Sequence, residues 1–414
     1  MFLPGLGAAV VVGAVLVAAP TAGAATPSCD GTPATIVVPL HTATATGTGG
    51  ADVIYVDAIN AVVDGLGGDD IICTSDASVA VLLGGEGRDR LTGRGTLDGG
   101  SGDDVLVSTG SDGAGVRGGD GNDQIVAEGP SGRAIYPGPG DDTIDSTASR
   151  GSTLDSLGFP SADGVTIGVP TGEPGAVDGE GHDTFVGRFR FYGTSGHDTF
   201  YGSSGDDTFY GLEGADTIFG FGGDDTLGAI APAMIDGGGG DDLIFPEFGG
   251  LARGGPGDDV FDTRMEASEA GGRTVASAYH LFGGRGNDTF RLRTYSDEGR
   301  ISRNPADGQR WRGAIAGGPD NDTVDLTPVG SAVVADLQKG RVRWGGGSST
   351  LAKVDSVIGS SRHDVLRGNA GSNRLVGRAG DDLLIGRGGR DTANGGPGRD
   401  TCRQVERRVS CERR

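Results

Sequence analysis

Aspartate and glycine recur in this chain at fixed places within a nine-residue unit. The longest uninterrupted run begins at Gly193 and restarts at Gly202, Gly211 and Gly220, with aspartate sixth and a large apolar residue eighth. Carboxylates and carbonyls are the oxygen ligands that calcium takes, and glycine permits backbone angles that turn carbonyls toward one point. The spacing therefore indicates a cation-binding turn that is repeated along the chain.

A second uninterrupted run starts at residue 359 and restarts at 368, 377, 386 and 395, and single copies lie at 99–107, 118–126, 254–262 and 283–291. The unit resembles the calcium-binding nonapeptide of the RTX (repeats-in-toxin) family, the hemolysin-type repeat of secreted bacterial proteins. Gly-Asp pairs also form ordinary turns, but turn formation alone does not require an apolar residue two places after every aspartate.

The resemblance implies an all-β fold, a right-handed parallel β-roll or β-helix solenoid with calcium-binding glycine-rich turns. It also implies that each of several Ca²⁺ ions takes an aspartate and backbone carbonyls from two successive turns on one edge. The metal-ligand role is carried to the matching aspartates, which are Asp70, Asp89, Asp104, Asp123, Asp142, Asp183, Asp198, Asp207, Asp216, Asp225, Asp242, Asp259, Asp288, Asp364, Asp382, Asp391 and Asp400. Asn373 stands at the aspartate place of its unit, and Asp320 replaces the fourth-place glycine before Asp322, so those two units depart from the pattern.

The elements that must position these turns are short strands over places seven to nine of each unit. Because side chains alternate along a strand, the eighth residue should point inward. We expect this of Ile72, Leu106, Ile125, Ile144, Phe185, Phe200, Phe209, Ile218, Leu227, Phe261, Phe290, Leu366, Leu375 and Leu384. Near the C-terminus the inward place falls to Ala393 and then Cys402, where a terminal cap is expected. A helix is conceivable only over Gln404–Ser410.

The phase of the units divides the chain. Before residue 178 the units restart at about twice the nine-residue period, which predicts acidic turns along one edge; the runs at 193 and 359 predict them along both. We therefore expect a signal peptide at 1–24, an N-terminal solenoid at 25–177, a central roll at 178–262, an irregular solenoid with insertions at 263–358, and a C-terminal roll with a disulfide cap at 359–414.

Composition limits the classes of function. The chain has 83 glycines in 414 residues, a formal charge of −23 and 35% apolar residues, so it cannot form one thick core. The acidic balance and only two lysines, Lys339 and Lys353, argue against nucleic-acid binding. Solvated acidic surface is the common alternative, yet here the acid sits at one fixed place in glycine turns.

The first residues predict secretion. An apolar run from Leu6 to Ala19 precedes Pro20 and a small-residue Ala-Gly-Ala stretch, as in a signal peptide; this run is short for a membrane span, and no membrane insertion is expected. An exported chain with four cysteines should form disulfides. Three pairings are possible, and proximity favours Cys29 with Cys73 and Cys402 with Cys411.

No catalytic motif is present: the sequence lacks H-E-x-x-H, G-x-S-x-G and a P-loop. His182, His197 and His363 occupy the fifth place of their units and are interpreted as tolerated surface residues. We expect a secreted calcium-binding module, structural or adhesive, that folds with calcium and takes a cell-surface glycan or wall polymer as a candidate partner.

Two alternatives stay open. One is a parallel β-helix enzyme acting on acidic polysaccharides through residues such as Arg188, Arg190, Asp325, Arg341 and Arg343. The other is an ice- or glycan-binding face made by threonines at the seventh place, which are Thr143, Thr184, Thr199, Thr208, Thr217, Thr226, Thr289 and Thr323. Threonine also favours strands without any recognition role.

Overall fold

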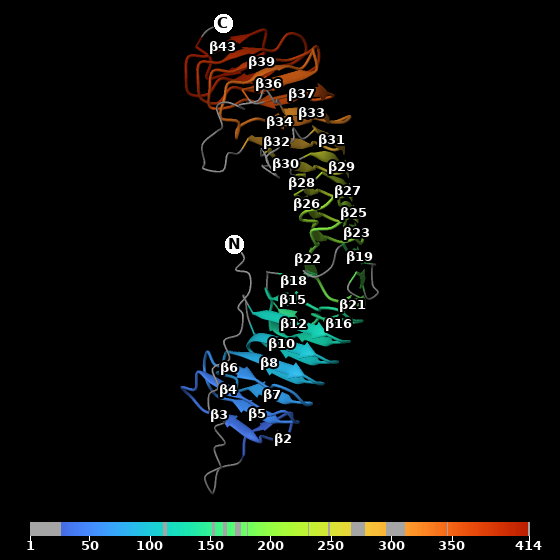
Figure 1. The fold of residues 1–414 in the computed structure, drawn as a ribbon. Helices are drawn as coiled ribbons and strands as arrows, with labels where there is room; N and C mark the ends of the chain where they lie inside the picture. The colour runs from blue at the N-terminus through green and yellow to red at the C-terminus, as the bar shows by residue number, and fades with distance from the viewer. Residues whose placement is uncertain are drawn as a thin grey trace. The chain divides into compact units, whose positions relative to one another are not determined.

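The chain forms stacked short strands in two compact units, as a computed structural model shows (Figure 1). The structure describes residues 26–110, 114–150, 154–159, 164–169, 175–179, 181–230, 232–246, 249–265, 278–294, 311–345 and 347–412. Unit 1 comprises residues 1–161 and 174–190, and unit 2 comprises residues 162–173 and 191–414. The predicted signal peptide at 1–24 lies outside the described residues. Within these ranges the chain contains strands and turns, and no helix.

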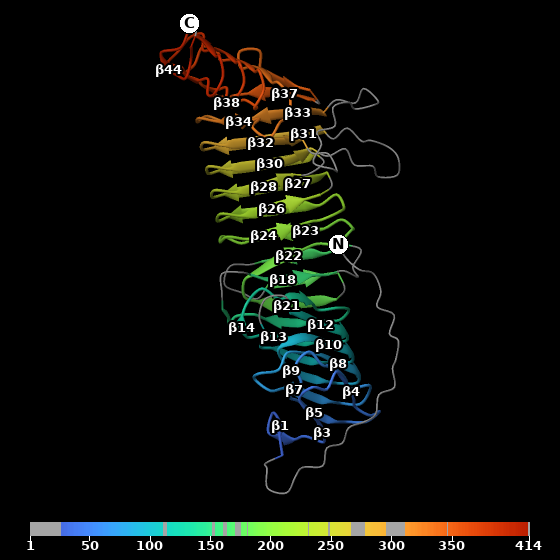
Figure 2. The same ribbon diagram turned by 90° about the vertical axis from the view of Figure 1, so that its left-hand side faces the viewer.

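Unit 1 winds between two parallel sheets, called here sheet I and sheet II (Figures 1 and 2). Sheet I contains β3 (Ile36–Val38), β5 (Val53–Val56), β7 (Ile71–Thr74), β9 (Arg90–Gly93), β11 (Val105–Ser108), β13 (Gln124–Ala127), β16 (Thr143–Asp145) and β21 (His182–Val186), with β20 (Gly175–Asp178) antiparallel to β21. Sheet II contains β4 (Thr44–Thr46), β6 (Val62–Asp64), β8 (Ala80–Glu86), β10 (Gly95–Ser101), β12 (Gly115–Asp120), β15 (Ala134–Tyr136) and β18 (Asp155–Gly158). Two small sheets pair β1 (Ser28–Cys29) with β2 (Thr32–Pro33) and β14 (Gly129–Pro130) with β17 (Ser149–Arg150).

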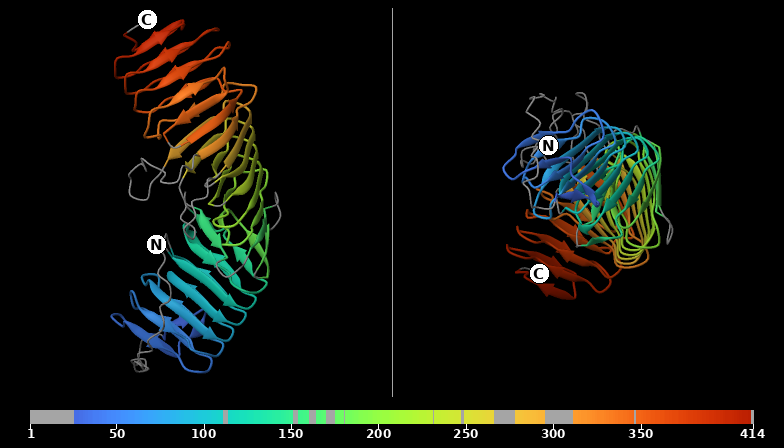
Figure 3. Two further views of the ribbon diagram at one scale, coloured as in Figure 1. Left: turned by 45° about the horizontal axis from the view of Figure 1, so that its top comes forward. Right: turned by 90° about the horizontal axis from the view of Figure 1, so that it is seen from below.

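Unit 2 repeats the arrangement with its own two sheets, whose strands lie side by side in Figure 3. Its sheet I contains β19 (Thr166–Gly168), β23 (Thr199–Tyr201), β25 (Thr217–Gly222), β27 (Ala233–Gly239), β29 (Gly250–Pro256), β31 (Ala278–Arg285), β33 (Trp311–Ala316), β37 (Gly347–Ala352), β36 (Arg341–Trp344), β35 (Val334–Asp336), β39 (Val365–Arg367), β41 (Leu383–Ile385) and β43 (Thr401–Arg403). Its sheet II contains β22 (Phe189–Tyr192), β24 (Thr208–Tyr210), β26 (Thr226–Ala229), β28 (Leu243–Pro246), β30 (Val260–Met265), β32 (Thr289–Thr294), β34 (Thr323–Asp325), β38 (Ser356–Ile358), β40 (Arg374–Val376), β42 (Thr392–Asn394) and β44 (Arg407–Val409).

The core of each unit is a ladder of inward apolar residues in register. In unit 1, Ile54 pairs with Ile72, which pairs with Leu91, and all three are fully buried. In sheet II of unit 2, Phe209 pairs with Leu227 and stacks near Phe191 and Phe200, with ring centroids 5.5 and 5.1 Å away. All fourteen eighth-place residues predicted to point inward are at most 2% exposed. The all-β parallel solenoid is thus confirmed.

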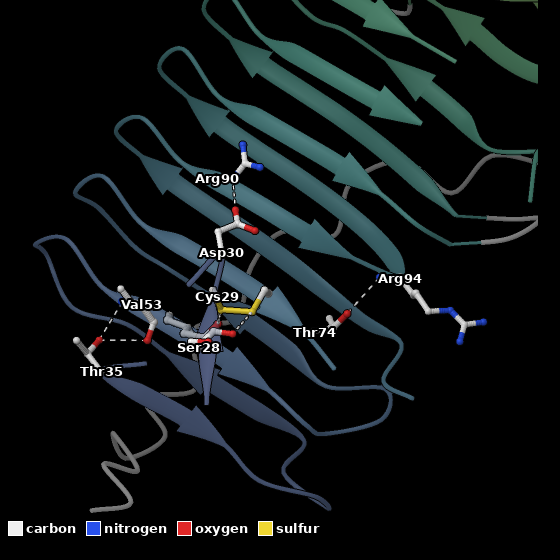
Figure 4. Close-up of a disulfide and its surroundings, with 10 residues drawn as sticks. Ser28, Cys29, Asp30, Thr35, Val53, Thr74, Arg90 and Arg94 are labelled. Atoms are coloured by element: carbon white, nitrogen blue, oxygen red, sulfur yellow. Dashed lines mark hydrogen bonds and ion pairs between the residues drawn. A yellow bond between two sulfur atoms is a disulfide. The ribbon is translucent and has the colours of Figure 1, made fainter. Parts of the chain in front are cut away.

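The two predicted disulfides are present, one toward each end of the described chain. Cys29 on β1 is joined to Cys73 on β7, and Figure 4 shows β1 lying across the strands, with Asp30 reaching the Arg90 guanidinium. Cys402 on β43 is joined to Cys411 in the tail. The conceivable helix at Gln404–Ser410 is wrong: Arg407–Val409 form β44, because this segment pairs in parallel with β42 and extends the sheet.

Candidate calcium-binding turns

The sixth-place aspartates form ladders along the edges where the turns enter the strands. In unit 1, each aspartate amide donates a hydrogen bond to the Oδ1 atom of the aspartate in the next coil, at 2.7–3.0 Å. The series is Asp52, Asp70, Asp89, Asp104, Asp123, Asp142 and Asp183. Six of these side chains directly precede strands of sheet I and Asp183 lies near the start of β21, so the acidic turns of unit 1 follow one edge, as the repeat spacing predicts.

Unit 2 carries such ladders on both edges. Before sheet I the Asp198 amide donates to Asp216, and further along, the amides of Asp364 and Asp382 donate to the next aspartate in the series ending at Asp400. Before sheet II the series is Asp207, Asp225, Asp242, Asp259, Asp288 and Asp322. Both edges are therefore acidic in the two uninterrupted runs, and from Asp242 to Asp322 the ladder formed by the described residues follows the sheet II edge.

Sequence reasoning missed some members of the ladders. Asp52 is 8% exposed and occupies the sixth place of the unit that starts at Gly47, so its phase could have revealed it. Asp322 takes a regular place although its turn departs from the pattern. In the tail, the carboxylates of Glu406 and Glu412 accept the amides of Asp391 and Asp400, each at 2.6 Å. No periodic signal marks these two glutamates, because they lie beyond the last unit.

The second residue of each turn decides what the aspartate Oδ2 atom contacts. In the turns of Asp52, Asp198, Asp207 and Asp364, the second residue is serine or threonine, and its amide donates to Oδ2 at 2.6–2.8 Å. Asn369 does the same for Asn373. We call these the closed turns. They stand where an acidic run begins on its edge.

In the remaining turns the second residue has a left-handed backbone in most cases, for example Gly119 (φ 119°), Leu212 (φ 66°) and Arg387 (φ 83°). There the Oδ2 atoms are buried without a hydrogen-bond partner; they belong to Asp70, Asp89, Asp104, Asp123, Asp216, Asp225, Asp242, Asp259, Asp288, Asp322, Asp382, Asp391 and Asp400. We call these the open turns. A buried carboxylate oxygen without a donor is costly unless a cation satisfies it.

The open turns also bring carbonyl oxygen beside that carboxylate oxygen. A β-carbon on Gly65 would lie 2.3 Å from Asp70 Oδ2 and 2.4 Å from the Gly84 carbonyl oxygen of the next coil, and Gly220 meets Asp225 and Gly237 in the same way. A side chain at Gly65 or Gly220 would clash with these atoms, and two oxygens converge there from successive coils. Within the described ranges no three His, Cys, Asp or Glu side chains are grouped to hold a metal, so a cation here would combine carboxylate with carbonyl oxygens, which suits calcium.

Burial makes these carboxylates poor acids in the absence of a cation. Desolvation by burial raises the pKa of Asp123, Asp225 and Asp259 to about 8. The amide hydrogen bond from the neighbouring coil opposes this shift, and the charges of the neighbouring carboxylates add to it. The same causes raise the pKa of Asp70 and Asp104 to about 7. A divalent cation would remove this penalty by supplying the missing positive charge.

The fifth-place side chains form a second, exposed ladder that runs in the opposite sense. The Asn122 amide donates to Asp103 of the preceding coil at 3.1 Å, and the Asp381 amide donates to Nδ1 of His363 at 2.6 Å. His197 accepts the Ala215 amide in the same way. His197 and His363 are exposed, as interpreted from the sequence, and both also accept an amide from the next coil; the ring of His182 instead contacts Asp178.

The residues of the two alternative functions lie on several different elements. Arg341 and Arg343 lie on sheet I of unit 2 and Asp325 lies on its sheet II, whereas Arg188 and Arg190 belong to unit 1. Threonines pair in short rows, Thr166 with Thr199 and Thr217 on one sheet and Thr208 with Thr226 on the other; Met234 and Leu243 follow them in register. The predicted threonine face is interrupted by apolar side chains.

The described chain is thus a parallel β-solenoid edged by stacked acidic glycine turns, the class of calcium-binding β-roll modules. Four segments match the family model of the RTX calcium-binding nonapeptide repeat, at residues 192–227, 280–292, 353–384 and 367–402. The chain contains this repeat, as its sequence predicts, and calcium is the ion that the repeat binds. No curated protein matches the chain. No helix in the described residues is long and apolar enough to span a membrane.

Proposed function

We propose that this protein is a secreted, non-catalytic solenoid whose folding depends on calcium and which serves as a structural or adhesive extracellular module. The observation that carries the proposal is the series of buried, unpartnered Oδ2 atoms in the open turns. Apolar burial in so glycine-rich a chain is thin, so neutralising these carboxylates decides whether the coils can stack.

The open turns are the proposed calcium ligands. Of the aspartates predicted from the sequence, Asp198, Asp207 and Asp364 lie in closed turns, where a serine or threonine of the same turn satisfies Oδ2. We therefore assign them to the start of each row rather than to a full site. Asp322 joins the proposed ligands because its Oδ2 is buried without a partner.

Secretion is supported by the signal-like N-terminal sequence and by two disulfides, which persist in oxidising compartments. The five predicted segments, 1–24, 25–177, 178–262, 263–358 and 359–414, remain our proposal for how the chain is organised. A surface glycan or wall polymer is the proposed partner class.

A calcium titration tests the proposal. The purified chain is treated with a chelator and then returned to excess calcium while far-ultraviolet circular dichroism is recorded. We expect the strand signal to collapse and return, with magnesium much less effective because it demands smaller, more regular coordination. If the strand signal changes neither with chelator nor with calcium, the basis for calcium-dependent folding is removed.

Matched substitutions separate the two kinds of turn. Asp242→Asn alters an open turn, and Asp364→Asn alters the sixth-place aspartate of a closed turn. Equilibrium dialysis of calcium should show fewer bound ions for Asp242→Asn than for Asp364→Asn. Equal losses in the two variants would contradict the assignment of sites to open turns.

A further inference from the structure

A basic cavity lies on the outer face of sheet I in unit 2, where the regular winding is interrupted. Its volume is about 290 Å³, and its charged lining is Asp336, Lys339, Arg341, Arg343, Arg367 and Arg387. Five cationic side chains with one carboxylate stand together here in a chain whose formal charge is −23. The acidic turns do not require such a cluster.

An inserted antiparallel strand builds the cavity. β36 lies between β35 and β37 and runs opposite to both, whereas β35 and β37 pair in parallel with β39 and β33. Val342 and Leu366 are fully buried, so the neighbouring Arg341, Arg343 and Arg367 point outward. Asp336 lies in register between Arg341 on one side and Arg367 on the other.

The single carboxylate of the cavity, that of Asp336, is already paired with one of the cations. Both Asp336 oxygens accept hydrogen bonds from the Arg387 guanidinium, at 2.8 and 3.0 Å, and the Lys339 amide donates to the same side chain at 3.1 Å. This fork holds the pKa of Asp336 below its usual value. Asp336 therefore positions Arg387 and leaves the other cations without a counter-charge.

The other arginines of the cavity have hydrogen-bond donors available for a ligand. In the part of the chain that the structure describes, the side chains of Arg341, Arg343 and Arg367 donate no hydrogen bond to a protein acceptor, and Arg341 and Arg343 are exposed. Guanidinium groups bind carboxylates and phosphates through paired hydrogen bonds. Grouping them costs free energy through like-charge repulsion, and a bound anion would offset that cost.

We propose that this cavity binds a uronate residue of an acidic polysaccharide, with Arg341 and Arg343 as its main ligands. The volume is near the lower end for small-molecule sites and suits one sugar residue. A nucleic acid is disfavoured because no aromatic side chain lines the cavity for base stacking. Arg387 is also the second residue of the Asp391 turn, so the cavity adjoins a calcium row, whereas the main ligands Arg341 and Arg343 lie on β36, outside the turns. The cavity therefore extends the proposed function beyond calcium binding.

The test compares two double variants of the full-length, calcium-loaded protein. Arg341→Ala/Arg343→Ala removes the two exposed arginines of the cavity, and Arg253→Ala/Arg374→Ala removes the same charge from exposed strand positions outside it. Binding of trigalacturonate is measured by calorimetry, with a neutral galactose oligomer, inorganic phosphate and sulfate as further probes. Circular dichroism checks that both variants keep the wild-type strand signal.

We expect trigalacturonate to bind wild type and the control variant with affinities within a factor of about two, and the cavity variant at least about tenfold more weakly, since each lost charged hydrogen bond is worth a tenfold change or more. The neutral oligomer should not bind. The proposal would be overturned if trigalacturonate did not bind, or if both variants bound it equally more weakly. It would also be overturned if the cavity variant bound it as well as wild type, through calcium bridging, or if phosphate or sulfate bound more tightly than trigalacturonate.

Discussion

Acid should partly replace calcium in stabilising this fold. In the metal-free folded state burial raises the pKa of Asp70 and Asp104 to about 7 and of Asp123 to about 8, whereas the unfolded values lie near 3.8. Between about pH 4 and pH 7 the folded chain therefore binds more protons than the unfolded chain. Stability falls as pH rises through this window and is gained on acidification.

The size of this pH dependence of stability follows from the number of aspartates whose pKa is raised. One carboxylate that is protonated when folded and ionised when unfolded contributes about 1.4 kcal/mol per pH unit, so these three give unit 1 a slope of up to about 4 kcal/mol per pH unit. Coupling between neighbours in the ladder spreads the titration and makes this an upper limit. The slope is large beside a typical total stability of about 5–15 kcal/mol.

The assay is circular dichroism in excess chelator from pH 8 down to pH 5.5, which stays above the sequence pI of about 4.5. We expect strand signal to appear as pH falls. Asp123→Asn should shift this transition to higher pH, because it removes one raised pKa while Asn373 shows that an amide fits the same place. A chelated chain whose strand signal is unchanged or lost on acidification would refute the reasoning.

Three further predictions concern the calcium-loaded protein. Phe209→Ala should cost about 3–5 kcal/mol in denaturant unfolding, because the side chain is fully buried among other rings; Tyr201→Ala, at an exposed place, should cost much less. Arg133→Met should lower stability by about 3–5 kcal/mol, since it strands the buried Asp155 carboxylate, and Arg133→Met/Asp155→Leu should recover much of the lost melting temperature. Replacing Cys402 and Cys411 by serine should cost about 2–3 kcal/mol for a loop of this size and speed amide exchange in β41 and β43 ahead of β25.

The features that could be predicted from the sequence are those that recur with the nine-residue period. Every unit repeats the inward apolar residue and the ladder aspartate, so one phase assignment places Phe200 in the core and Asp216 on an edge, and the structure puts both there. The disulfides were also predictable, because each joins cysteines that are near one another in the sequence. These features depend on local spacing and on stacking with an identical neighbour.

Features that depend on exceptions to the period were not predictable. β36 runs against the sheet because of the turns around Lys339 and Gly340, and nothing in the repeat pattern indicates its direction. Arg133 is buried because seven hydrogen-bond acceptor atoms from separate segments surround its side chain, including those of Ser108, Gly110 and Glu128. An arginine in a polar sequence gives no sign of such an environment.

The two ladders together explain why calcium should act on whole rows of turns rather than on single turns. At the sixth place each amide donates forward to the next coil, and at the fifth place each amide donates backward to the preceding coil. A turn can therefore satisfy its polar groups only when both neighbours are formed, and a cation in one turn favours the next. A closed turn such as that of Asp198 provides its own donors through Thr194 and needs no ordered turn before it. The rows that begin at closed turns, two of which end at Glu406 and Glu412, are consequently the units in which calcium binding and folding should be cooperative.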